Sequence, residues 1–150
     1  MDVEIDQSGR VEYTSQPTVV ADSEGNSVIL PSKDKRILQE IYRNSGKPRV
    51  YAIQVFAALI FILLKNYPRK KIYLVIDREY PGYDDLIKSY LIQLTRKNIK
   101  VKLEKDWIDF RLIGKKSKAH DTALEAFRSK EANMQVDFKE IMSLVIQYER

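Results

Sequence analysis

Ten consecutive apolar residues, Val55–Leu64, constrain the fold of this chain more than any other segment. Gln54 and Lys65 close the run on either side. Because a helix needs about 20 apolar residues to cross a bilayer, the run is too short for a membrane span. It therefore predicts a helix over about residues 49–67 that the rest of the protein covers on all sides.

The chain is long enough to cover such a helix. Its 150 residues are 44% hydrophobic and 31% charged, which is the composition of a folded globular protein. We expect one domain over residues 1–150, with a core over about 3–128 and a C-terminal helix over about 136–149. The first residues are acidic and show no signal peptide, so we expect a cytoplasmic protein that does not associate with a membrane.

The absence of cysteine removes several classes of chemistry. The chain has no Cys and a single His, His120. Disulfides, thiol nucleophiles and cysteine-based zinc sites are excluded, and a metal site with several histidines is disfavoured.

The spacing of apolar residues predicts an α/β fold. Strands are predicted at Val3–Asp6, Thr18–Ala21, Ser27–Leu30, Lys71–Asp77, Lys100–Leu103 and Trp107–Leu112. Besides the apolar helix, helical spacing recurs over Ile37–Tyr42, Leu86–Leu94, Leu124–Phe127 (after a possible Ser117 cap) and Phe138–Tyr148. A hairpin followed by alternating helices and strands predicts a mixed sheet flanked by helices on both faces. The continuous apolar run Ile72–Ile76 is typical of a strand that is covered on both faces.

The positive charge lies downstream in the chain. The formal net charge is +5, but residues 1–34 contain two basic and seven acidic residues, whereas residues 35–150 contain 24 basic and 14 acidic ones. The basic residues gather in Lys65–Lys71, Arg96–Lys105 and Arg111–Lys118. These clusters are compatible with a phosphate backbone, although on their own they fit a solvated lysine-rich surface better.

Acidic residues follow two predicted strands and begin one predicted helix. Asp6 ends the first strand, Asp77 ends the apolar strand with Glu79 two residues on, and Asp121 lies in the first turn of the helix after Ser117. Element ends of this kind are where open α/β sheets place their sites, so we favour a convergent group over scattered surface acids.

Converging carboxylates repel one another, and a divalent cation such as Mg²⁺ or Mn²⁺ relieves that repulsion. Two such ions activate water and stabilise a leaving oxygen in phosphodiester hydrolysis. Lys115, Lys116 and Lys118 are then expected to hold the phosphate chain of a nucleic acid.

The order of elements and three short motifs resemble the ribonuclease H-like superfamily of nucleases, resolvases and transposases. The motifs are Ile5-Asp6-Gln7-Ser8-Gly9, Asp77 after Ile72–Ile76, and Lys116-Ser117-Lys118-Ala119-His120-Asp121. The resemblance covers about residues 3–128. It implies a ribonuclease H-like mixed sheet and metal ligation by Asp6, Asp77 and Asp121. Many members that cleave RNA in hybrids have a Glu on the first core helix, where this chain has only Gln54. Glu79 can replace that ligand from the strand side.

His120 and three tyrosines leave two interpretations open. His120, beside Asp121, fits a proton shuttle or phosphate contact as well as it fits packing beside Leu124 and Phe127. Tyr13, Tyr80 and Tyr83 lie near the predicted carboxylates, where a ring can stack on a base, but packing is the commoner role of tyrosine.

The sequence therefore predicts a divalent-metal-dependent nuclease, with Asp6, Asp77, Asp121, Glu79 and His120 at its site and DNA or RNA, branched or hybrid, as its partner. The alternative is a catalytically inactive nucleic-acid-binding or protein-interaction module with the same fold.

Overall fold

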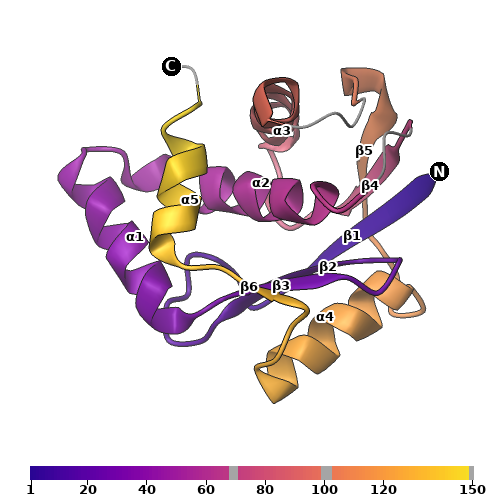
Figure 1. Cartoon of the computed structure of the whole chain (residues 1–150), viewed down its shortest axis with the longest axis horizontal. Coiled ribbons are helices and arrows are strands. Elements are labelled where there is room, and N and C mark those ends of the chain that lie inside the picture. Colours follow the sequence, from indigo (N-terminus) through magenta and orange to yellow (C-terminus); the bar gives the residue numbers. More distant parts are fainter. Residues whose placement is uncertain (68–70, 99–102, 149–150) are drawn as a thin grey trace.

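The computed structural model describes residues 1–67, 71–98 and 103–148. One six-stranded mixed sheet runs through the molecule in the order β5-β4-β1-β2-β3-β6 (Figure 1). Its strands are β1 (Asp2–Ser8), β2 (Thr18–Asp22), β3 (Ser27–Leu30), β4 (Tyr73–Asp77), β5 (Ile108–Arg111) and β6 (Met134–Gln135). β1, β2 and β3 form an antiparallel meander, whereas β4 pairs parallel with β1, β5 with β4, and β6 with β3. The fold is α/β.

Five α-helices flank this sheet. They are α1 (Ser32–Asn44), α2 (Tyr51–Leu64), α3 (Asp84–Asn98), α4 (Lys118–Ser129) and α5 (Phe138–Val145). Two short 3₁₀ helices, η1 (Pro48–Val50) and η2 (Lys105–Trp107), precede α2 and β5. The Ser117 hydroxyl caps α4 by accepting a hydrogen bond from the Ala119 amide, as its position in the sequence predicts.

The helices lie on both faces of the sheet. Helix α2 packs on one face, with α1, α3 and α5 on the same side, and among the described residues only α4 covers the other face (Figure 1). The predicted all-round burial of the apolar helix is confirmed, because twelve of the fourteen residues of α2 are buried. No helix in the described part of the chain has both the length and the apolar character that a membrane crossing needs.

Strand β4 differs from the sequence-based expectation. Leu74 and Ile76 are buried toward α2, but Tyr73 is exposed and Val75 is half-buried on the opposite face. The expectation of a strand covered on both faces is therefore wrong. The reason is that α4 packs against β1, β2 and β3, so that it leaves that face of β4 open.

Two further differences concern short segments. The predicted strand at Lys100–Leu103 falls largely on residues 99–102, which lie outside the described residues. Trp107 belongs to η2 rather than to β5. The sequence does not predict the two-residue strand β6, since a segment this short has no periodicity to reveal it.

The loop after β1, residues 9–17, is held by one buried lysine. Lys35 on α1 has no exposed surface, and its Nζ donates hydrogen bonds to the carbonyl oxygens of Arg10 (3.0 Å), Tyr13 (2.6 Å) and Gln16 (2.7 Å). Burial lowers the pKa of Lys35 to about 8. The loop is therefore ordered by contacts from the helix beneath it.

Candidate metal centre

Three acidic side chains meet at one end of the sheet. Asp6, Asp77 and Glu79 each offer a carboxylate oxygen, and these oxygens lie within 4.8 Å of one another. We call Asp6, Asp77 and Glu79 the carboxylate cluster. Asp6 is buried, whereas Asp77 and Glu79 are half-buried. These are two of the three aspartates that the sequence predicts to converge, joined by Glu79 from the strand side.

The parallel pairing of β1 and β4 brings the aspartates together. Ile5 pairs with Ile76, and Asp6 and Asp77 each follow directly in their strands. Because neighbouring residues in a parallel pair point to the same face, both aspartates project away from α2. This is the face on which α4 leaves β4 open, so the carboxylate cluster lies beside an uncovered strand.

Backbone amides hold the two aspartates in place. One carboxylate oxygen of Asp6 accepts a hydrogen bond from the Gln7 amide at 2.8 Å. Asp77 Oδ1 accepts one from the Ile113 amide at 2.7 Å, which ties the end of β4 to the segment after β5. The main chain therefore fixes the orientation of both aspartates.

Burial and mutual repulsion disfavour full ionisation of this cluster. Burial raises the pKa of Glu79 to about 8, helped by a hydrogen bond with Asp77 and by the charges of Asp77 and Asp6. Burial also raises the pKa of Asp6, with the charge of Asp77 acting in the same direction. Such a group releases its protons more readily when a cation lies among the oxygens.

Helix α4 adds His120 to the cluster. The Nδ1 atom of His120 lies 3.0 Å from Asp6 Oδ2, and about a third of the His120 side chain is exposed. At the cap of the same helix, the Ser117 hydroxyl donates to Glu4 Oε1 at 3.0 Å. These contacts fix the start of α4 against β1, so the imidazole faces both a carboxylate and solvent.

Asp121 lies elsewhere. Its side chain is exposed on α4, in a shallow depression with Leu124, Glu125, Arg128 and Ser129, and it is not part of the carboxylate cluster. Successive residues of a helix point about 100° apart, so a helix that turns His120 toward Asp6 turns Asp121 away. The structure thus brings together Asp6, Asp77, Glu79 and His120, but not Asp121.

The lysines predicted to contact nucleic acid are exposed. Lys115 and Lys116 lie in the loop that leads into α4, and Lys118 is the first residue of that helix. None of the three forms an ion pair with a residue that the structure describes. They therefore present free positive charge at the end of α4 where His120 lies.

Gln54 on α2 has no part in the cluster. Its Oε1 accepts a hydrogen bond from the Tyr42 hydroxyl at 2.7 Å, and its Nε2 donates to the Tyr90 hydroxyl at 3.1 Å. The helix position at which the resemblance leads one to expect an acid is thus part of a tyrosine network between helices.

The side chains present suit a hard divalent cation. Carboxylate oxygens are the ligands that Mg²⁺ and Mn²⁺ prefer, and three of them are gathered here with too little positive charge nearby to balance them. Arg10 lowers the pKa of Glu79, but the net effect of the surroundings is still a raised value. Asp6, Asp77 and Glu79 can therefore hold Mg²⁺ or Mn²⁺.

Comparisons with known proteins identify no relative of this chain. No protein-family model matches the chain, and searches of curated proteins and of solved structures give no match.

Proposed function

We propose that this protein is a divalent-metal-dependent phosphodiesterase that cleaves nucleic acid. The observation that supports this most directly is the convergence of Asp6, Asp77 and Glu79, with His120 against Asp6. These residues come from β1, from the end of β4 and from α4, so the arrangement is a product of the fold and not of sequence proximity alone.

Asp6, Asp77 and Glu79 would hold one or two Mg²⁺ or Mn²⁺ ions. When bound, such ions lower the pKa of a water and neutralise charge on a phosphate. His120 is partly exposed and hydrogen-bonded at Nδ1, which leaves Nε2 to pass a proton to or from a phosphodiester oxygen. Asp6 orients that imidazole.

We also propose that the fold belongs with the ribonuclease H-like superfamily. Support comes from the antiparallel meander β1-β2-β3, the parallel addition of β4 and β5 beyond β1, and the acids Asp6, in the second half of β1, and Asp77, at the end of β4. The sequence predicts that Asp6 ends the first strand, but β1 continues to Ser8. The helical ligand that the resemblance assigns to Asp121 is not present in the cluster. We propose that Glu79 takes its place.

Nucleic acid is the proposed substrate because of the charges around the cluster. Lys115, Lys116 and Lys118 are exposed, form no ion pair with a described residue and lie next in the chain to the helix that carries His120. The chain has a net charge of +5 despite its acidic first segment. Cationic side chains that flank a carboxylate-bound cation are suited to a polyanion.

The test compares Asp77→Asn with Asp109→Asn. The first substitution keeps a side-chain oxygen that can accept from the Ile113 amide but removes the charge, whereas Asp109 is an exposed acid on β5 that pairs with Arg111. We expect Asp77→Asn to abolish both Mn²⁺ binding in calorimetry and Mn²⁺-dependent cleavage of labelled DNA, RNA, hybrid and branched substrates. Asp109→Asn should retain both. Unchanged cleavage by Asp77→Asn would refute the proposal.

A second candidate is a nucleic-acid-binding domain without catalysis. It is favoured by one observation, the commitment of Gln54 to Tyr42 and Tyr90 where an acid is expected. Salt-dependent binding of the same substrates, with no cleavage in Mg²⁺ or Mn²⁺, would support this candidate over the enzyme.

A further inference from the structure

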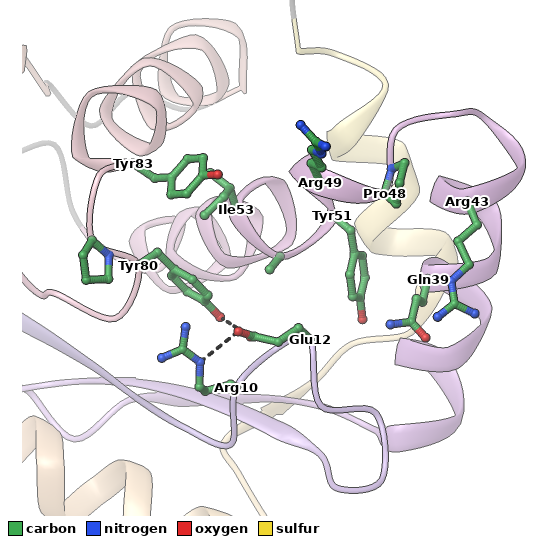
Figure 2. A pocket seen from close by; sticks show the side chains of 12 residues that line it. Arg10, Glu12, Gln39, Arg43, Pro48, Arg49, Tyr51, Ile53, Tyr80 and Tyr83 are labelled. Atoms are coloured by element: carbon green, nitrogen blue, oxygen red, sulfur yellow. Dashed lines mark hydrogen bonds and ion pairs between the residues drawn. The ribbon is translucent and has the colours of Figure 1, made fainter.

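A pocket of about 410 Å³ opens on the α2 side of the molecule, at the start of that helix. Arg10 and Glu12 rise into it from the loop after β1, Tyr80 and Tyr83 line one side, and the segment from α1 to α2 supplies Arg43 and Arg49 on the other (Figure 2). We call it the arginine pocket. Its size is within the range of small-ligand sites.

The arginine pocket has a surplus of positive charge. It contains three arginines and one acid, and that acid, Glu12, already accepts hydrogen bonds from Arg10 Nε at 2.9 Å and from the Tyr80 hydroxyl at 3.3 Å. Arg43 and Arg49 are exposed and form no ion pair with a described residue. Two guanidinium groups are therefore available to an anion, and their forked donors suit a phosphate.

Aromatic rings complete the lining. The Tyr80 ring is buried, lies 4.8 Å from the Arg10 guanidinium carbon and packs against Phe56, so it forms a fixed wall. Tyr83 has a large apolar ring and is nevertheless 42% exposed. An exposed ring on one side of a pocket and free guanidinium groups on the other are suited to the base and the phosphate of one nucleotide (Figure 2).

The arginine pocket and the carboxylate cluster are linked through the segment that follows β4. Tyr80 directly follows Glu79 in the chain, and Arg10 lies close enough to Glu79 to lower its pKa. The Glu79–Tyr80 step thus connects two sites, the carboxylate cluster on the face of the sheet away from α2 and the arginine pocket on the α2 side.

Hydrogen bonds within the protein preform the arginine pocket. Lys35 holds the backbone of the loop at Arg10 and Tyr13, and the Tyr51 hydroxyl bonds to the carbonyl oxygens of Val11 (3.1 Å) and Lys35 (3.2 Å). Preformed walls reduce the entropic cost of binding.

We propose that the arginine pocket binds one nucleotide of a single-stranded nucleic acid, with Arg43 and Arg49 on its phosphate and Tyr83 stacked on its base. This inference rests on the proposed function, from which it takes nucleic acid as the ligand. It adds the place where a single strand is bound.

The test measures binding without cleavage. Fluorescence anisotropy of a labelled oligothymidylate is followed in EDTA, so that no divalent cation takes part, for the wild type and for the double variant Arg43→Gln/Arg49→Gln. We expect about a tenfold loss of affinity and a salt dependence shallower by about 0.7 in log Kd against log salt, since the two arginines share one phosphate and each phosphate contact to a single strand contributes about 0.7.

The matched control removes the same charge elsewhere. Arg96→Gln/Arg128→Gln changes two exposed arginines on α3 and α4 and should lose much less affinity. Tyr83→Ala should weaken binding of oligothymidylate but not of an abasic strand with the same phosphates. Equal losses in the two double variants would overturn the proposal, as would thymidine monophosphate binding as tightly as the strand, which would make the pocket a free-nucleotide site.

Failure of this inference and failure of the proposed function are distinguishable. If Asp77→Asn abolishes cleavage while the Arg43→Gln/Arg49→Gln protein binds normally, the proposed phosphodiesterase activity is supported and the proposed nucleotide binding by the arginine pocket is wrong. If the double variant loses binding while the wild type cleaves nothing in Mn²⁺, the proposed nucleotide binding by the arginine pocket is supported and the proposed phosphodiesterase activity is wrong.

Discussion

The imidazole Nδ1 of His120 lies 3.0 Å from a carboxylate oxygen of Asp6, although 114 positions separate the two residues in the chain. The contact joins the first strand of the sheet to the one helix that covers its second face. The contact places the imidazole against the carboxylate cluster, which is the geometry that a proton shuttle there would need.

His120→Asn tests the part that this imidazole has in the proposed reaction. Loss of a general acid or base lowers the rate by about 10² to 10⁴, so we expect Mn²⁺-dependent cleavage to fall by that factor. Mn²⁺ binding, measured by calorimetry, should change little because His120 is not one of the three clustered acids. The neighbouring exposed Asp121 gives the control: Asp121→Asn should cleave at the wild-type rate. A large loss in Asp121→Asn would return that residue to the site.

Glu79→Gln tests the repulsion within the carboxylate cluster. Above about pH 8, where Glu79 is ionised, the metal-free protein holds three nearby negative charges. Removing one of them should raise the Tm in EDTA and should abolish most of the Tm increase that Mn²⁺ gives the wild type. Differential scanning fluorimetry with and without Mn²⁺ measures both. Glu40→Gln, at an exposed acid on α1, should alter neither quantity.

Lys35→Met tests how the loop over residues 9–17 is held. The variant leaves three carbonyl oxygens without their ammonium donor, so we expect the free energy of unfolding to fall by about 2–4 kcal/mol. Urea denaturation measures this loss, and amide exchange should speed up in the loop. Lys33→Met, at an exposed lysine two residues earlier, should change stability by less than about 0.5 kcal/mol.

The lowered pKa of Lys35 predicts that the stability difference between the wild type and Lys35→Met depends on pH. The folded wild type releases the Lys35 proton near pH 8, whereas the unfolded chain keeps it until about 10.5. Between these values the unfolded state binds more protons, so rising pH favours the folded wild type by up to about 1.4 kcal/mol per pH unit. The stability difference between wild type and Lys35→Met should therefore widen from pH 8 upward. A constant difference across this range would contradict the lowered pKa.

Gly9→Ala tests the tight turn that follows β1. Gly9 has a φ of +77°, and a β-carbon there would collide with the Pro17 carbonyl oxygen and lie 2.6 Å from a ring carbon of Phe127. Left-handed strain and the clash together should cost roughly 2–4 kcal/mol, measured by urea denaturation. Gly114→Ala serves as the comparison, because nothing lies within 4 Å of the added carbon. Equal stability of the two variants would show that the turn relaxes.

Local patterns predict most of the elements. Alternation at Val3–Asp6, the hairpin at residues 18–30 and helical spacing around Leu38 and Leu91 all correspond to elements of the structure. These patterns depend on which face of one element is buried, and that information is written into neighbouring residues.

Features that depend on packing between distant segments are harder to predict. The open face of β4 follows from how far α4 extends across the sheet, and Val75 and Tyr73 are apolar enough to suit a covered strand. The exclusion of Asp121 follows from the rotation of α4 about its axis, which its sequence does not reveal without its contacts to β1 and β2.

The arginine pocket could not be predicted for the same reason. Its arginines come from the loop after β1, from the end of α1 and from η1, and in the sequence each looks like an ordinary surface cation. Tyr83 stands out in the sequence only because it lies near Asp77. Their juxtaposition requires the loop that Lys35 orders.

The one-sided reach of α4 would determine from where the proposed substrate approaches. Helix α4 packs on β1, β2 and β3 and leaves β4 open on that face, next to the half-buried Asp77 and Glu79. If the proposed cleavage takes place, a nucleic acid would enter from the β4 side, where no helix of the described residues covers the sheet.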